Sequence, residues 1–216
     1  MENRFFSLQK LLYLLIFIGV GSIFFWISWI HFHHTPQLKN NPIPIYGSLP
    51  PFSLIEAEGR QITQNDFLNK ISVIDFIFTR CQGQCPFMSE KMKDLQKILP
   101  KDSRLQWVSI SVDPEWDEPP VLQEYAKKYQ NALSPWLFLT GKKEMIFSLM
   151  KEGFHLGVSE AGGTVEEPIL HSNRFVLVDP QGQIRGYYPA TDEDRFEQLK
   201  KDILTLLHRT HERQET

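Results

Sequence analysis

The stretch that decides the fold is ISVIDFIF at residues 71–78, followed directly by TRCQGQCP at residues 79–86. The first eight residues are a nearly continuous run of β-branched and aromatic side chains, which is typical of a strand buried on both faces. Pro86 suits the first turn of a helix, where its missing N–H would be unpaired anyway. Apolar side chains then recur on one helical face, at Met88, Met92, Leu95 and Leu99. The pattern predicts a central strand, a loop carrying Cys81 and Cys85, and a helix over residues 86–99.

Strands and helices alternate along the rest of the domain. Strand patterns occur at residues 52–55, 105–112, 136–140, 174–179 and 183–187, and helical patterns at residues 120–129, 142–152 and 192–208. The last two strand patterns flank a Pro-Gln-Gly turn and predict a hairpin. Asp192 is the expected N-cap of the last helix. Strands alternating with helices, closed by a hairpin and a helix, predict an α/β fold with a mixed central sheet.

Composition sets broad limits on the class of protein. The chain has 216 residues, which suits one domain with additional segments. Its net charge is −3 with both signs interspersed, so nothing points to a nucleic acid or an anionic surface as a partner. Two cysteines are too few for a disulfide-rich scaffold.

The N-terminal segment predicts a membrane anchor. Residues 11–30 (LLYLLIFIGVGSIFFWISWI) contain no charge and are long enough to span a bilayer as one helix. Arg4 and Lys10 precede this run, so the positive-inside rule places residues 1–10 in the cytoplasm. A cleaved signal peptide is the competing interpretation, but it would have a shorter apolar core and a small-residue cleavage site. We therefore expect a linker over residues 31–50, an extracytoplasmic domain over residues 51–208 and a polar tail over residues 209–216.

The cysteine pair is the main candidate for chemistry. Cys81 and Cys85 fall between the end of a central strand and the start of a helix, where ligand sites gather in open α/β sheets. The N–H groups and dipole of a helix N-terminus favour thiolate over thiol. Such a pair can form a disulfide or hold a soft metal ion. Two inert core cysteines or a structural disulfide are the alternatives, although a disulfide that closes so small a loop stabilises little.

Several short motifs occur in a specific order along the domain. They are Phe52-Ser-Leu, Asp66-Phe67, Phe78-Thr-Arg-Cys81, Cys85-Pro86, Ser109-Ile-Ser-Val-Asp-Pro114, His171-Ser172 and Val178-Asp-Pro-Gln-Gly182. This combination resembles the Sco/SenC family, the copper chaperones used in assembling the copper A centre of cytochrome c oxidase. The resemblance implies a thioredoxin-like fold and a copper ion bound by Cys81, Cys85 and His171. Family members commonly have Pro-Asp within the cysteine loop, whereas this chain has Gln-Gly-Gln at residues 82–84.

The chemistry of these residues agrees with the implied copper site. Cu(I) prefers soft thiolates and accepts imidazole as a further ligand. Two thiolates and a neutral His171 leave a Cu(I) site with a net charge of −1, which Arg80 and the helix N-terminus would offset. Cu(II) is a second candidate state. His155 is either an alternative ligand or a loop histidine without a metal role. Asp113 is either an acidic residue near the site or a cap of the turn before Pro114.

The leading hypothesis is a metallochaperone held in the cytoplasmic membrane. It would take copper from a donor protein on the periplasmic or extracytoplasmic side and deliver it to the copper A subunit of cytochrome c oxidase or to another copper acceptor. The alternative is a thiol–disulfide oxidoreductase, with Cys81 and Cys85 as its redox pair, that reduces cysteines of the copper-accepting protein. His171 favours the chaperone, since simple dithiol exchange does not need it. A peroxidase ranks third, because nothing marks a dedicated peroxide-activating cysteine.

Overall fold

The computed structural model describes residues 42–129, 135–156 and 172–212, together with residues 13, 17, 19–26 and 29 of the N-terminal segment. Its contacts divide the chain into two units, Met1–Pro42 and Ile43–Thr216. In the first unit residues 19–26 are helical. Within the described part of the chain, no helix is both long and apolar enough to cross a membrane. The remaining positions of the expected anchor at residues 11–30 lie outside the described residues.

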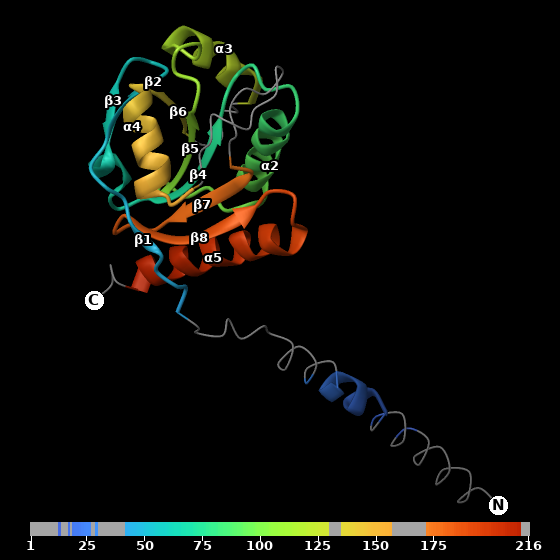
Figure 1. Cartoon of the computed structure of the whole chain (residues 1–216). Coiled ribbons are helices and arrows are strands. Elements are labelled where there is room, and N and C mark those ends of the chain that lie inside the picture. Colours follow the sequence, from blue (N-terminus) through green and yellow to red (C-terminus); the bar gives the residue numbers. More distant parts are fainter. Residues whose placement is uncertain are drawn as a thin grey trace, which may run out of the picture. The chain divides into compact units, whose positions relative to one another are not determined.

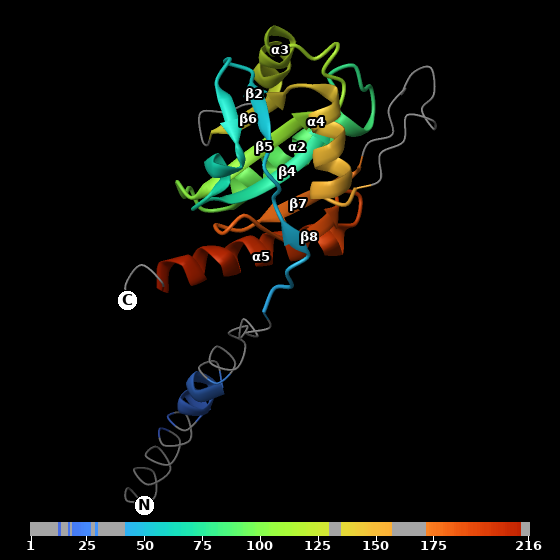
Figure 2. The same ribbon diagram turned by 60° about the vertical axis from the view of Figure 1, so that its left-hand side comes forward.

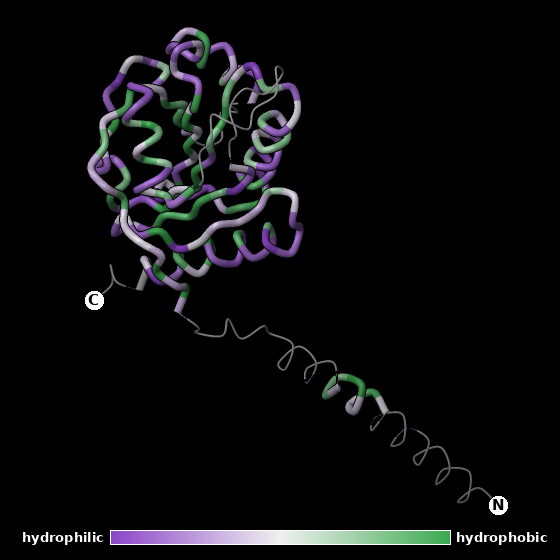
Figure 3. The backbone as a smooth tube through the Cα atoms, in the orientation of Figure 1, coloured by the Kyte–Doolittle hydropathy of each residue, from purple (hydrophilic) through white to green (hydrophobic). Residues whose placement is uncertain are grey.

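The second unit is built on one eight-stranded mixed sheet in the order β1-β8-β7-β4-β5-β6-β2-β3 (Figure 1). The predicted central strand is confirmed as β4 (Ile71–Ile77), which runs parallel to β5 (Leu105–Ser111) and antiparallel to β7 (Arg174–Val178). The remaining strands are β1 (Gly47–Ser48), β2 (Ser53–Glu56), β3 (Gln61–Thr63), β6 (Trp136–Thr140) and β8 (Gln183–Pro189). Every residue of β4 and of β5 is buried. Figure 3, coloured by hydropathy, shows hydrophobic stretches of backbone inside the domain.

Helices cover both faces of the sheet. On one face lie α2 (Gln84–Ile98), α3 (Pro119–Tyr129) and α5 (Glu193–Glu212). Ser89 of α2 hydrogen-bonds Tyr125 of α3, and Lys91 of α2 pairs with Glu193 of α5 at 2.8 Å. On the other face lies α4 (Lys143–Ser148), in front of the strands in Figure 2, continued by a π-helical turn (Leu149–Gly153). A short 3-10 helix (Gln64–Phe67) links β3 to the strand β4.

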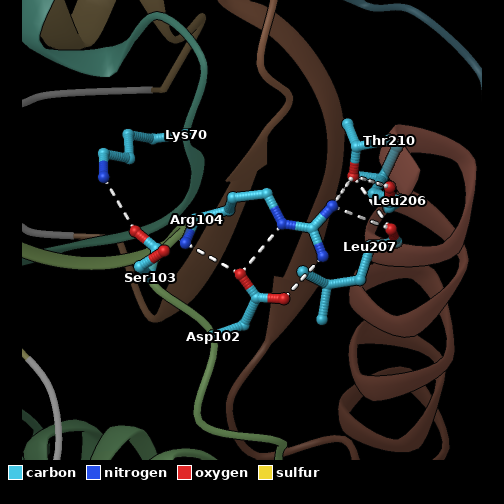
Figure 4. Close-up of polar contacts among 7 residues, drawn as sticks. All are labelled: Lys70, Asp102, Ser103, Arg104, Leu206, Leu207 and Thr210. Carbon is cyan, nitrogen blue, oxygen red and sulfur yellow. Dashed lines mark hydrogen bonds and ion pairs between the residues drawn. The ribbon is translucent and has the colours of Figure 1, made fainter. Parts of the chain in front are cut away.

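Polar contacts fasten the C-terminal end of α5 to the start of β5 (Figure 4). The Arg104 guanidinium donates to the Leu207 carbonyl at 3.2 Å and to the Thr210 hydroxyl at 2.7 Å. Asp102 holds this guanidinium through Nε and Nη2. Nearby, the Lys70 ammonium donates to the Ser103 carbonyl at 2.7 Å. Arg104 therefore links the start of β5 to the last turns of α5.

Several boundaries differ from those expected. The strand β1 lies inside the segment assigned to a linker, and its neighbours Tyr46 and Leu49 donate backbone hydrogen bonds to Ile184 and Gly182. A two-residue edge strand shows no apolar alternation, so the pattern could not reveal it. The expected helix over residues 142–152 divides into α4 and the π-helical turn. Finally, α5 continues to Glu212 rather than ending at residue 208; at its start Asp192 accepts the Arg195 N–H, as an N-cap does.

Candidate metal and thiol site

Cys81 and Cys85 lie where β4 ends and α2 begins. The strand ends at Ile77 and the helix starts at Gln84, with Gly83 as its N-cap, two residues earlier than expected. Both side chains are buried, with 4% and 0% of their surfaces exposed, and no disulfide joins them. Because β4 and β5 are parallel, this loop shares its edge of the sheet with the loop that follows β5.

Backbone N–H groups point at both sulfur atoms. The Cys85 N–H donates to the Sγ of Cys81 at 3.3 Å, and the Phe78 N–H donates to the Sγ of Cys85 at 3.4 Å. The first contact is the one expected from a cysteine placed at the N-terminus of a helix. Both bonds favour the charged form of a sulfur atom over the neutral thiol. The local backbone is therefore arranged to receive negative charge at the cysteine pair.

Burial acts against this arrangement at Cys85. Removal from water raises the pKa of the Cys85 thiol far above its ordinary range, and the Phe78 N–H only partly opposes the effect. The negative charges of Cys81 and Asp75 raise the Cys85 pKa further. Cys85 therefore keeps its proton in the reduced, metal-free chain. A cation or a reacting partner must supply the free energy for its ionisation.

Asp117 ties the cysteine loop to the neighbouring strand. Its buried carboxylate accepts the Thr79 N–H at 3.0 Å, the Thr79 hydroxyl and the Ser111 hydroxyl at 2.6 Å. Burial raises the pKa of Asp117, and these hydrogen bonds oppose the rise. Thr79 precedes Cys81 by two residues, so the bonds fix the approach to the pair. Sequence reasoning missed Asp117, because an acidic residue in a polar stretch after a strand gives no sign of burial.

Arg80 and Asp113 form an ion pair beside the cysteines. The Arg80 guanidinium contacts the Asp113 carboxylate at 2.5 Å and lies over the half-exposed ring of Trp116, 4.7 Å from its centroid. The side chain of Asp113 is thus engaged with Arg80, while its backbone carbonyl accepts the Trp116 and Asp117 N–H groups. Arg80 was expected to offset the charge of the site. The structure pairs its guanidinium with Asp113, and its effect on a metal-loaded site stays a prediction.

The other candidate ligands separate clearly. His171 lies outside the described residues, so its place as a third ligand stays a prediction. His155 takes a left-handed backbone conformation (φ 51°) and its ring lies near Gly47 of β1, three strands away from β4. Met88 and Met92 are fully buried, which confirms their expected place in the core. Within the described ranges, no three His, Cys, Asp or Glu side chains gather as a metal site.

Comparison with known proteins decides the family. The sequence model of the SCO1/SenC family matches residues 46–208. The chain belongs to the SCO1/SenC family. It is 30% identical over 169 residues to the SCO1 protein homolog of Bacillus subtilis, a match that covers 77% of this chain and 85% of that protein. Proteins of the Sco family bind copper and take part in cytochrome c oxidase assembly.

Solved Sco structures share the fold, which confirms the expected thioredoxin-like α/β class. A SCO1/SenC family lipoprotein from Bacillus anthracis superposes with a TM-score of 0.69 at 30% identity, covering 77% of this chain and 98% of that one. Yeast Sco1 with copper bound superposes with a TM-score of 0.58 at 26% identity, covering 74% and 89% of the two chains. The donors of the present chain suit such a metal, because two sulfur atoms that each accept a backbone N–H can become the soft thiolates preferred by Cu(I).

Proposed function

We propose that this chain is a membrane-anchored copper chaperone that delivers copper to the copper A site of cytochrome c oxidase, outside the cytoplasm. Copper is its cargo, held by Cys81, Cys85 and His171. The observation that carries the proposal is the buried, disulfide-free cysteine pair at the junction of β4 and α2, with a backbone N–H directed at each sulfur. The membership of the SCO1/SenC family supports the same cargo.

The geometry suits binding followed by transfer. Cu(I) accepts two or three ligands, so an incoming cysteine or histidine of an acceptor can join before a ligand of the chaperone leaves. Cys81 retains slight exposure whereas Cys85 has none, so the acceptor first meets the side of the site formed by Cys81. The raised pKa of Cys85 favours release, because regaining its proton stabilises the emptied pair. His171 would supply the third ligand.

A thiol–disulfide oxidoreductase is the second candidate, and the closeness of Cys81 and Cys85 at the start of α2 favours it. In this reaction the Cys81 thiolate attacks a disulfide of the copper acceptor, and one acceptor sulfur leaves as a thiolate. Cys85, after losing its proton, then attacks the Cys81 sulfur and releases the second acceptor thiolate. The acceptor gains two electrons, and the chaperone is left with a Cys81–Cys85 disulfide. The 3.3 Å contact between Cys85 N and Cys81 Sγ already brings the two residues together.

Copper binding by the full chain in detergent tests the proposal. The reduced protein is titrated with Cu(I) under anaerobic conditions against a competing Cu(I) chelator. Wild type is expected to bind about one copper per chain tightly, and Cys81→Ser, Cys85→Ser and His171→Ala should each weaken binding by at least about tenfold. His155→Ala is the matched control, because His155 lies beside β1, and should bind as wild type does. Absence of tight copper in wild type, with a readily reversible disulfide, would instead assign the chain to the oxidoreductases.

A further inference from the structure

A buried carboxyl group lies in the sheet beneath the cysteine helix. Asp75 occupies the middle of β4 and has no exposed surface. Its Oδ1 accepts the Ser109 hydroxyl at 2.6 Å, and the Ser109 oxygen in turn accepts the Trp136 indole N–H at 2.9 Å. Its Oδ2 has no hydrogen-bond partner in the described structure. Burial raises the pKa of Asp75 to about 7, although the Ser109 bond opposes this rise.

The surroundings of Asp75 connect it to the cysteine pair. The register places Asp75 opposite Ser109 of β5. The next residue, Phe76, packs on Phe154 at the end of the π-helical turn, so Asp75 points to the other face, which α2, α3 and α5 cover. From α2 the groups on this face are Cys85 and Ser89, and from α3 the group is Tyr125, whose hydroxyl bonds Ser89. Burial also raises the pKa of Tyr125, so this phenol stays neutral. Toward the same layer β7 and α5 contribute the rings of Phe175 and Phe196.

Asp75 and Cys85 therefore affect the charge of each other. The negative charge of Asp75 is one of the causes that raise the pKa of Cys85, after burial and the influence of Cys81. This coupling is reciprocal, so a thiolate at Cys85 raises the pKa of Asp75. No hydrogen bond joins the free Asp75 oxygen to either sulfur. The two groups act on one another through the low-dielectric layer between sheet and helix, where like charges interact strongly.

We propose that Asp75 is a charge-compensating proton site, which takes up a proton when the cysteine pair becomes anionic on copper loading and releases it when copper leaves. The proposal rests on the copper-binding function proposed above. On loading, both thiols lose their protons, Cu(I) binds the two thiolates, and the Asp75 carboxylate gains one proton. Starting from ionised Asp75, the chain thus releases one proton to solvent instead of two. The layer holds one negative charge fewer, and the thiolates are stabilised.

The number of protons released per copper tests the proposal. Cu(I) is titrated into the reduced full chain in detergent, and calorimetry in buffers of different ionisation enthalpy gives the count. At about pH 7, where Asp75 is half ionised, wild type should release about half a proton fewer than Asp75→Asn. The deficit should approach a full proton at about pH 8 and vanish at about pH 5. The control is Asp202→Asn. It alters a carboxyl on α5 that accepts a hydrogen bond from the Tyr188 hydroxyl of β8, and it should match wild type.

Infrared spectroscopy gives a readout that a merely structural role would not move. Copper loading at about pH 8 should produce the carbonyl stretch of a protonated carboxylic acid in wild type and in Asp202→Asn, but not in Asp75→Asn. Ser109→Ala serves as a second variant should Asp75→Asn fail to fold. Loss of the Ser109 hydrogen bond leaves Asp75 more protonated before loading, so the proton deficit at about pH 7 should shrink. Equal proton counts in wild type and Asp75→Asn, without the carbonyl band, would overturn the proposal.

A measurement without copper separates this inference from the copper-binding function. The ultraviolet absorbance of thiolates is followed as the pH of the reduced, metal-free chain is raised. Thiolate should form at lower pH in Asp75→Asn than in wild type, because one negative charge near Cys85 is gone. If the chain binds no copper but shows this shift, the proposed function fails and the charge coupling holds. If copper binds while the thiolate titrations coincide, the inference about Asp75 fails.

Discussion

Cys85 must become a thiolate to react, but its buried surroundings disfavour the thiolate. The sulfur needs to ionise to bind copper or to attack a disulfide, yet its surface is fully covered. Burial gives the thiol a raised pKa, and the Phe78 N–H compensates only in part. A residue of this kind is inert until a metal ion or a partner sulfur reaches it. Cys81, with its slight exposure, is the natural first contact.

Alkylation rates should reveal this difference between the two cysteines. In the reduced chain at about pH 7, Cys81→Ser leaves only Cys85, which should react with iodoacetamide at least about tenfold more slowly than free cysteine. Both the raised pKa of Cys85 and its lack of exposure contribute. In about 8 M urea the chain is unfolded and both effects vanish, so the same variant should react at the rate of free cysteine. A folded Cys81→Ser chain that reacts as fast as free cysteine would contradict this account of the site.

Asp75 should also make the stability of the domain depend on pH. Its folded pKa of about 7, against an ordinary value of 3.8, corresponds to roughly 4 kcal/mol at most. Below the ordinary value the carboxyl is protonated in both states and has no effect. Between about pH 4 and 7 the unfolded chain ionises this carboxyl while the folded chain keeps its proton, so the free energy of unfolding falls, and the fall levels off above about pH 7. Urea unfolding from about pH 5 to 8 should show this loss in wild type, and a much smaller loss in Asp75→Asn.

At the scale of elements, the loops after β4 and β5 act as one unit through Asp117. Its carboxylate gathers the backbone and hydroxyl of Thr79 and the hydroxyl of Ser111. Asp117→Ala should lower the free energy of unfolding by roughly 2–3 kcal/mol, because these buried donors lose their acceptor. It should also speed amide exchange in the cysteine loop. Ser111→Ala removes one donor and leaves the Thr79 bonds, so its effect should be smaller. Equal effects of the two changes would show that Asp117 does not organise the loop.

The link between Arg104 and α5 is a second element-scale feature that can be tested. Arg104→Met keeps the apolar stem but removes the donors to Leu207 and Thr210. The last turns of α5 should then fray, with roughly 1–2 kcal/mol lost in urea unfolding and faster amide exchange after residue 203. The exposed pair of Lys97 and Asp94 supplies the control, since Lys97→Met should leave unfolding almost unchanged. Unaltered exchange at the end of α5 in Arg104→Met would rule out the proposed fastening.

The sequence predicts elements best where one physical signal dominates. The apolar run at Ile71–Ile77 identified β4, and helical periodicity placed Met88 and Met92 in the core. The strand β1 was missed because it pairs with β8 through backbone hydrogen bonds, and a strand of two residues is too short to show an alternating pattern in the sequence. Asp117 and the network around Asp75 were missed for a different reason. Whether a carboxyl is buried depends on how distant segments pack, and single-chain patterns do not record such packing.

At the scale of the whole molecule, the proposed function requires that the domain face the compartment in which copper A is assembled. The uncharged residues 11–30 and the preceding Arg4 and Lys10 predict one membrane span with its N-terminus in the cytoplasm. In cells whose outer envelope has been made permeable while the cytoplasmic membrane stays intact, added protease should therefore digest the domain. Residues 1–10 should stay protected. The chain should also remain with membranes after alkaline carbonate extraction. Replacing Gly19 and Gly21 by Arg, which places two charges in the predicted span, should release it from them. A wild-type chain that alkaline carbonate extracts would contradict the anchor. It would leave the proposed copper site at β4 and α2 untouched, because Ile43–Thr216 forms a unit of its own.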